Sequence, residues 1–181
     1  HPNVEILGKT VIGDHVEILC GSYLNNAVIK DHVTIDSSKI QDSSVDEYTT
    51  IGPMSHLRNN THVGKHCRIG NFVEFKNTNF GDGSKCAHLT YVGDSDVGKN
   101  VNFGCGVVTV NYDGKNKFRT TIKDGAFIGS NVNLIAPVTI GENALLAAGS
   151  TITDDVEDGD MGIARNRQSN KEGYGTQYKN K

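Results

Sequence analysis

The chain has 181 residues, a formal net charge of −3 and four isolated cysteines without a CxxC pair. Its charges of both signs are spread along the sequence and form no basic stripe, so we expect no nucleic-acid partner. No apolar run approaches the roughly 20 residues that cross a bilayer, and no basic and apolar leader opens the chain, so we expect no membrane partner and a soluble, cytoplasmic protein. The cysteine spacing predicts reduced thiols, with no disulfide and no zinc cage.

A six-residue repeat organises the sequence from its first residues onward. The repeat is already under way at Ile6 without a polar cap, so we expect an earlier domain to precede it. Five-residue steps, such as Leu24 to Ile29 and Phe75 to Phe80, predict shortened turns that keep the number of hexads. The central run places a large apolar residue at every sixth position, and its members are Val45, Ile51, Leu57, Val63, Ile69 and Phe75.

One polar segment interrupts the repeat between Thr109 and Ile122. Its sequence, VNYDGKNKFRTT, is rich in turn-forming residues and predicts an excursion loop over about 110–121. After Val156 the periodicity stops. We therefore predict two parts, a β-helix domain over 1–157 and an irregular C-terminal tail over 158–181. Between the excursion loop and the tail, the repeat resumes with Ile122, Ile128, Leu134, Ile140, Leu146 and Ile152.

The period of six determines the fold class. It matches neither the 3.6 residues of a helix turn nor the simple alternation of a strand, so each hexad must be one short strand and one turn. Three hexads close a triangular coil, and successive coils stack as parallel strands about 4.8 Å apart. We predict an all-β parallel β-helix of roughly eight coils, because a β-sandwich would require hairpin dipeptides and wider turn spacing.

Phasing the hexads places distant residues side by side on one corner of the prism. Arg58 and Lys76 then share a turn position one coil apart, and we place Tyr91 at the same corner on the next coil. Two cations and a phenol at this spacing predict an anion site, although two solvated surface charges would give the same pattern. This face, called face A, begins on successive coils with Leu57, Phe75 and Val92.

A second column lies on another face, called face C. His88 is the third residue of the hexad that Cys86 opens, and third positions point away from the core. Cys105 has the same position on the next coil, and Ser130 and Ala148 continue the column. Because three of these residues are small, we expect a groove along the prism axis that has room for an extended ligand.

Several motifs carry a specific family resemblance over nearly the whole chain: IGPMSHLR, VGKHCRIGNFVEFKN, HLTYVGD, NYDGKNK, FIGSNVNLIAPVTIG and AAGSTIT. In these motifs the chain resembles the C-terminal half of the bacterial bifunctional N-acetylglucosamine-1-phosphate uridyltransferase/glucosamine-1-phosphate acetyltransferases. The resemblance implies a left-handed β-helix that forms a homotrimer, with active sites between subunits. It also implies acetyl transfer from acetyl-CoA to glucosamine 1-phosphate, without a metal, for UDP-N-acetylglucosamine and cell-wall synthesis. The family's uridyltransferase domain has no counterpart here.

The resemblance also implies roles for individual residues. His88 matches the catalytic base that takes a proton from the 2-amino group, and the backbone N–H of Cys105 matches the group that stabilises the oxyanion. Glu74 either orients that base or is an exposed strand carboxylate. The residues that match sugar-phosphate contacts are Arg58, Lys76, Tyr91, Asn102 and Lys117. Those that match acetyl-CoA contacts, some shared with the substrate, are Cys105, Asn111, Tyr112, Ser130, Ala148 and Arg165.

The sequence departs from the family pattern at three positions. Asn59 and Arg167 stand where relatives often have proline, and Cys105 replaces an alanine. Three other functions remain open. They are a different acetyl-CoA-dependent hexapeptide transferase, a non-catalytic β-helix scaffold, and a zinc hydratase that would use His62 and His66 together with His88.

Overall fold

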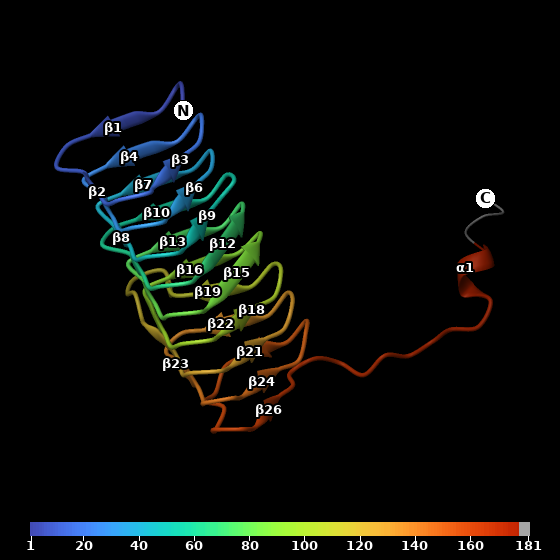
Figure 1. Cartoon of the computed structure of the whole chain (residues 1–181). Helices are drawn as coiled ribbons and strands as arrows, with labels where there is room; N and C mark the ends of the chain where they lie inside the picture. The colour runs from blue at the N-terminus through green and yellow to red at the C-terminus, as the bar shows by residue number, and fades with distance from the viewer. Residues whose placement is uncertain (178–181) are drawn as a thin grey trace.

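Short strands wind around a triangular prism in the computed structural model, which describes residues 1–177 (Figure 1). Three sheets run along the prism, and neighbouring strands within each sheet are parallel. Consecutive strands of the chain lie on different faces, so each sheet pairs every third strand, except that the last strand, β26, pairs with β24. The predicted parallel β-helix of hexapeptide repeats is confirmed.

The strands fall into three sets. Face A contains β1 (Glu5–Leu7), β4 (Tyr23–Asn25), β7 (Lys39–Gln41), β10 (His56–Arg58), β13 (Glu74–Lys76), β16 (Tyr91–Gly93), β19 (Val108–Val110), β22 (Asn133–Ile135) and β25 (Thr151–Ile152). Face B contains β2 (Val11–Ile12), β5 (Val28–Ile29), β8 (Ser44–Val45), β11 (His62–Val63), β14 (Asn79–Phe80), β17 (Ser95–Val97), β20 (Thr120–Ile122) and β23 (Val138–Ile140). Face C contains β3 (Glu17–Ile18), β6 (Thr34–Ile35), β9 (Thr50–Ile51), β12 (Arg68–Asn71), β15 (Lys85–His88), β18 (Asn102–Phe103), β21 (Phe127–Ile128), β24 (Leu145–Leu146) and β26 (Met161–Gly162).

The core follows the hexad pattern. The large residue at the first position points inward and is buried in both predicted runs, from Val45 to Phe75 and from Ile122 to Ile152. The smaller residue four positions later is buried as well, and polar examples make hydrogen bonds. Thr49, for instance, donates to the carbonyl of Gly64 and accepts from the N–H of Cys67. Each coil therefore contributes to a continuous apolar interior, although the buried hydroxyl of Ser22, at the same hexad position, has no hydrogen-bond partner within residues 1–177.

The three edges of the prism consist of turns, which we call corners A–B, B–C and C–A after the faces they join. Many turn residues adopt the left-handed conformation, with asparagine or glycine at most of these positions. Asparagine and glycine tolerate positive φ better than other residues, which explains why the sequence uses them between strands.

The end of the β-helix lies beyond the predicted boundary at 157. Strand β26 pairs with β24, so the coils continue to Gly162 within the predicted tail. After Ala164 the chain leaves the prism and ends its described part in the single helical turn α1 (Tyr174–Gln177) (Figure 1). No helix within residues 1–177 has the length and hydropathy needed to traverse a bilayer. The last part of the predicted tail, 178–181, lies outside the described residues.

Candidate active site

Corner A–B carries a cluster of cations at the predicted anion site. Arg58 and Lys76 are direct partners in the register of β10 and β13, and the excursion loop brings Lys117 to Lys76. The site is hollow, with a volume of about 320 Å³, and we call it the cationic cavity. Its lining residues are Asn59, Asn60, Lys76, Asn77, Asp94 and Lys117.

The excursion loop is fastened to the prism at both ends. At its start, the side-chain amide of Asn111 donates to the Oδ2 atom of Asp94. At its end, Arg119 makes two hydrogen bonds to Asp96, of 2.8 and 2.6 Å, and one of 3.0 Å to the carbonyl of Ser95. Between them, Tyr112 and Lys117 form an antiparallel bridge. These contacts fix the backbone from which Lys117 reaches Lys76.

Asp94 is a buried carboxylate that the sequence analysis did not single out. It is 6% exposed, and it accepts hydrogen bonds from the amides of Asn77 and Asn111. Burial acts to raise the pKa of Asp94, but these two hydrogen bonds and the charges of Lys76 and Lys117 outweigh it, so the pKa lies below its usual value. An ionised Asp94 at 3.8 Å from Lys76 offsets one of the cations and leaves the corner positive.

Lys76 lies between opposing influences. Its contact with Lys117 has the largest effect and lowers the pKa of Lys76, and burial and the nearby charges of Lys117 and Arg58 act in the same direction, against the charge of Asp94. Ammonium groups this close repel one another unless an anion lies between them. The arrangement therefore favours binding of a dianion such as a phosphate.

Arg58 is held by Glu74 rather than directed freely into the cavity. The guanidinium donates to Oε1 of Glu74 from Nε at 2.7 Å and from Nη2 at 2.6 Å. Both side chains are about one-third exposed, so the pair contributes little to stability. The alternative role of Glu74, orienting His88, stays a prediction, because within one chain its ion pair is with Arg58.

Tyr91 occupies a different register from the predicted one. It pairs with Glu74, whereas Gly93 is the partner of Lys76. The ring nevertheless lies over Gly93, since a Cβ atom added to that glycine would collide with the Tyr91 hydroxyl. The missing side chain at Gly93 leaves room for the phenol beside the corner, so Tyr91 reaches this region from one end of β16.

The predicted column beginning at His88 is present at corner C–A. The N–H of Gly106 donates to the carbonyl of His88 at 3.4 Å, and the N–H of Asn131 donates to the carbonyl of Cys105 at 2.8 Å. The N–H of Gly149 similarly donates to the carbonyl of Ser130 at 2.8 Å. All four residues of the column, His88, Cys105, Ser130 and Ala148, are exposed. Their side chains thus form a line along the prism axis.

The last coil brings Arg165 to the end of this column. The N–H of Ala164 donates to Oγ of Ser150, which holds the segment against the prism. The side chain of Arg165 lies beside Gly149, at 3.8 Å from the position that a Cβ atom would take there. A cation therefore stands at the end of the column opposite to His88.

A single chain does not bring all the predicted site residues together. His88 ends a strand of face C, whereas Lys76 ends a strand of face A, so they lie on different edges of the prism. Asn102 begins β18 on face C, near corner B–C. His62 is on face B and His66 is in the following turn, so these histidines do not gather around His88 within the chain.

One of the two exposed cysteines provides a direct probe of the column. Cys20 and Cys105 are exposed, whereas Cys67 and Cys86 are buried. Burial raises the pKa of the Cys67 thiol to about 11 and that of Cys86 to about 12, so both stay protonated and unreactive at neutral pH.

We expect N-ethylmaleimide to modify two thiols in the native protein and to block acetyl-CoA binding through Cys105. The bulky adduct would occupy the line between His88 and Ser130. Mass spectrometry counts the adducts, and calorimetry measures acetyl-CoA binding before and after treatment. The variant Cys105→Ala should keep binding after treatment, whereas Cys20→Ala should lose it as the wild type does. Loss of binding in treated Cys105→Ala would place the sensitive thiol elsewhere.

Comparison with known proteins identifies the class of fold. Residues 119–154 match the family model described as bacterial transferase hexapeptide (six repeats). LpxA from Acinetobacter baumannii aligns over 91% of this chain and 70% of its own, with a TM-score of 0.66 and 13% identity. The UDP-N-acetylglucosamine acyltransferase from Campylobacter jejuni aligns over 86% and 68%, with a TM-score of 0.64 and 16% identity. The chain thus has the hexapeptide-repeat β-helix fold.

The sequence similarity is more specific. The chain is 53% identical over 174 residues to bifunctional protein GlmU of Exiguobacterium sp. strain AT1b, covering 96% of this chain and 39% of that protein. It is 55% identical over 174 residues to bifunctional protein GlmU of Shouchella clausii, covering 96% and 38%. The chain therefore spans about two-fifths of the length of these relatives. The family resemblance indicated by the motifs is confirmed.

Proposed function

We propose that this chain is a glucosamine-1-phosphate N-acetyltransferase that uses acetyl-CoA and yields N-acetylglucosamine 1-phosphate for UDP-N-acetylglucosamine synthesis. The observation that carries the proposal is the exposed column from His88 to Ala148, on the same molecule as the cationic cavity. The similarity to the GlmU proteins supports the same reaction. The predicted cytoplasmic location follows from this role and stays a prediction.

In the proposed reaction, the neutral imidazole of His88 removes a proton from the 2-amino group of the sugar. The nitrogen of this amino group attacks the thioester carbonyl at the same time. A C–N bond forms, the carbonyl becomes an oxyanion, and the C–S bond then breaks to release coenzyme A, whose sulfur takes up a proton. The N–H of Cys105 makes no hydrogen bond to another residue within 1–177, so it is available to the oxyanion. Its side chain has no role in the step.

Lys76, Lys117 and Arg58 would hold the sugar phosphate, with Tyr91 and Asn102 as further sugar contacts. The paired ammonium groups of Lys76 and Lys117 suit a phosphate dianion, which would relieve their repulsion. Ser130, Ala148 and Arg165 would accommodate acetyl-CoA along the column, with Arg165 near its phosphates. Asn111 and Tyr112 lie at the root of the excursion loop and would contact either ligand.

The geometry supports an active site formed between copies of the chain. The amine and the phosphate of glucosamine 1-phosphate are on neighbouring carbon atoms. In one chain, His88 and Lys76 are separated by the width of face A, which is roughly 10 Å for three extended residues. This separation is large for two groups on neighbouring carbon atoms, which supports a second copy supplying one of the two residues. We propose the homotrimer as this assembly.

An exposed apolar ridge next to His88 supports the same assembly. Met54, Phe72 and Leu89 follow one another along corner C–A, and each is more than half exposed. All three adopt positive φ, an unusual conformation for bulky side chains, where the equivalent turns of other coils have glycine, asparagine or serine. A second copy of the chain that covers this ridge would bury it and place its own residues beside His88.

The direct test is an acetyl-CoA-dependent assay that follows thiol release with glucosamine 1-phosphate. We expect turnover with this substrate and little turnover with unphosphorylated glucosamine, because the cationic cavity would lack its ligand. Equal rates with the two amines would favour a different hexapeptide acetyltransferase. The absence of thiol release by trimeric protein would contradict the proposal.

We expect Lys76→Ala to weaken glucosamine 1-phosphate binding by ten- to a hundredfold while acetyl-CoA affinity changes less than twofold. The lysine side chain is only 14% exposed and lines the cationic cavity, so its loss removes one of the charges that would hold the phosphate. Calorimetry measures both affinities. Lys65→Ala is the matched control, since Lys65 pairs with Glu47 on another corner. Equal losses for the two ligands would argue against a phosphate site at this corner.

A further inference from the structure

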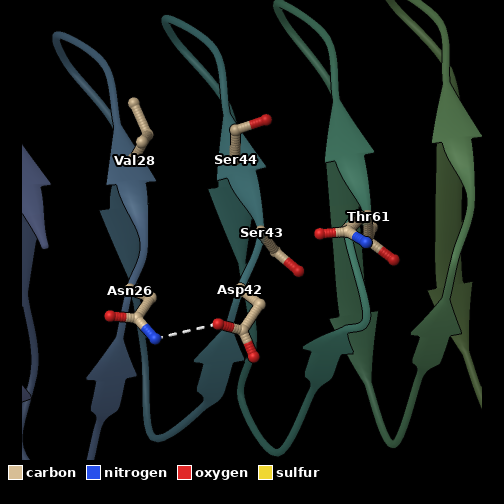
Figure 2. A pocket seen from close by; sticks show the side chains of 7 residues that line it. Asn26, Val28, Asp42, Ser43, Ser44 and Thr61 are labelled. Carbon is tan, nitrogen blue, oxygen red and sulfur yellow. Dashed lines mark hydrogen bonds between the residues drawn. The ribbon is translucent and has the colours of Figure 1, made fainter. Parts of the chain in front are cut away.

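A second cavity of about 390 Å³ lies on corner A–B, on the N-terminal side of the cationic cavity. It extends over three successive coils, and Asn60 lines both cavities, so the two hollows adjoin each other. Figure 2 shows the side chains that line it, arranged along β5 and β8 and in the turns before β5, β8 and β11. Its lining residues, which we call the polar subsite, are Asn26, Val28, Asp42, Ser43, Ser44, Asn60 and Thr61.

The hollows arise from the length of one turn. Three residues, 59–61, join β10 to β11, whereas two residues make the corresponding connections from β4 to β5, from β7 to β8 and from β13 to β14. The longer turn contains two consecutive residues with positive φ, Asn59 and Asn60. Because the longer turn, 59–61, lies between shorter turns, it has a hollow on its N-terminal side and the cationic cavity on its C-terminal side.

The polar subsite has the chemistry of a carbohydrate site. The amide of Asn26 donates to Oδ1 of Asp42 at 2.9 Å, which orients a carboxylate whose Oδ2 atom has no partner within residues 1–177 (Figure 2). The carboxamide of Asn60 makes no side-chain hydrogen bond within the same residues. The Asp42 carboxylate and the Asn60 carboxamide can pair with neighbouring hydroxyl groups of a ligand, and Val28 offers an apolar surface. The hydroxyls of Ser43 and Ser44 are already bonded to the Gln41 carbonyl and to the His62 ring.

The charge of the polar subsite indicates what it does not bind. None of its seven lining residues is a lysine or arginine, and Asp42 is the one charged group among them. A phosphate would be repelled there and attracted to Lys76 and Lys117. The two adjoining cavities therefore suit the two parts of one ligand, an anionic part and a neutral part rich in hydroxyl groups.

We infer that the acceptor site continues into the polar subsite and binds amino sugars joined through a diphosphate to a second polyhydroxylated group, as in a nucleoside diphosphate sugar, which is a diphosphate diester. The inference rests on the proposed function for the position of the phosphate. A sugar monophosphate fills the cationic cavity alone, whereas a diester also fills the polar subsite. A diester of the product would thus compete with glucosamine 1-phosphate.

Calorimetry on the intact protein, without acetyl-CoA, tests this inference independently of turnover. The probes are N-acetylglucosamine 1-phosphate and uridine diphosphate N-acetylglucosamine. We expect the diester to bind at least tenfold more tightly than the monoester. Equal or weaker binding of the diester, or no binding of either probe, would overturn the inference.

A double variant distinguishes the polar subsite from a mere effect of the additional phosphate. Asn26→Gly/Asp42→Gly removes both side chains at positions where φ is positive, so glycine fits the backbone. We expect the tenfold preference to fall to less than twofold while monoester affinity is unchanged. Asn143→Gly is the control, a glycine substitution at another positive-φ turn, and it should keep the preference. A preference that survives in the double variant would refute the subsite.

The outcomes for the two proposals can be separated. If the diester preference depends on Asn26 and Asp42 but no thiol release occurs with glucosamine 1-phosphate, the subsite stands and the proposed reaction fails. If turnover is normal but the two probes bind equally, the reaction stands and the inference fails.

Discussion

Replacing His88 by alanine is expected to lower kcat for acetyl transfer by roughly 10²- to 10⁴-fold, the range for loss of a general base. The imidazole is exposed at the end of β15 and does not contribute to the core, so the fold should be unaffected. Steady-state assays of thiol release measure kcat, and acetyl-CoA affinity should change less than threefold. The loss should be smaller at high pH, where more of the substrate amine is already unprotonated.

The control for this prediction is another exposed histidine on a strand. His62 lies in β11 on face B, where it contacts Ser44 and Asp46, and His62→Ala should keep kcat within twofold. Unchanged turnover in His88→Ala would remove the proposed mechanism. A similar loss in both variants would indicate a general effect on folding, which circular dichroism and size-exclusion chromatography would detect.

The fold could be predicted because the period of six is a property of the backbone path. A residue at the first position of every hexad must point inward, so the spacing of Leu57, Phe75 and Val92 is enough to align them on successive coils. The column from His88 to Ala148 follows from the same counting, because each of its members has the third position of a hexad. Register in a β-helix is therefore encoded in sequence spacing.

The contacts that depend on turn length and side-chain direction could not be predicted in this way. Tyr91 precedes Val92 and so aligns with Glu74, and only the missing side chain at Gly93 lets its ring reach the corner. Asp94 and Arg119 hold the excursion loop, but a loop without periodicity gives no register for locating its partners. The spacing of Asn77, Asp94 and Asn111 was the available signal for this cluster.

A stacked column of rings at corner B–C also escaped the sequence analysis. His15, His32, Tyr48 and His66 lie one above another, with ring centroids 4.9, 4.6 and 5.1 Å apart. All four have positive φ, which directs successive side chains outward in parallel. The hexad pattern places them on one edge, but the stacking depends on a backbone conformation that aromatic residues seldom adopt.

The largest loss of stability is expected for Phe75→Ala, about 3–5 kcal/mol in the free energy of unfolding. The ring is fully buried and packs against Phe80 at a centroid distance of 4.9 Å, and Phe80 in turn lies 5.9 Å from Phe103. Each coil contacts only its neighbours, so a cavity in one coil weakens the stacking on both sides. Urea denaturation at fixed protein concentration measures the change.

Phe127→Ala provides the matched substitution, because Phe127 lies in β21 but is 49% exposed. Its loss should cost less than about 1 kcal/mol, since much of the ring already contacts water. Similar losses for the two variants would contradict an interior built from first-position residues. Because Phe75 lies between Glu74 and Lys76 in β13, Phe75→Ala should also weaken sugar-phosphate binding under conditions where the protein is still folded. The apolar residue that holds the coil thereby also sets the position of the proposed phosphate site.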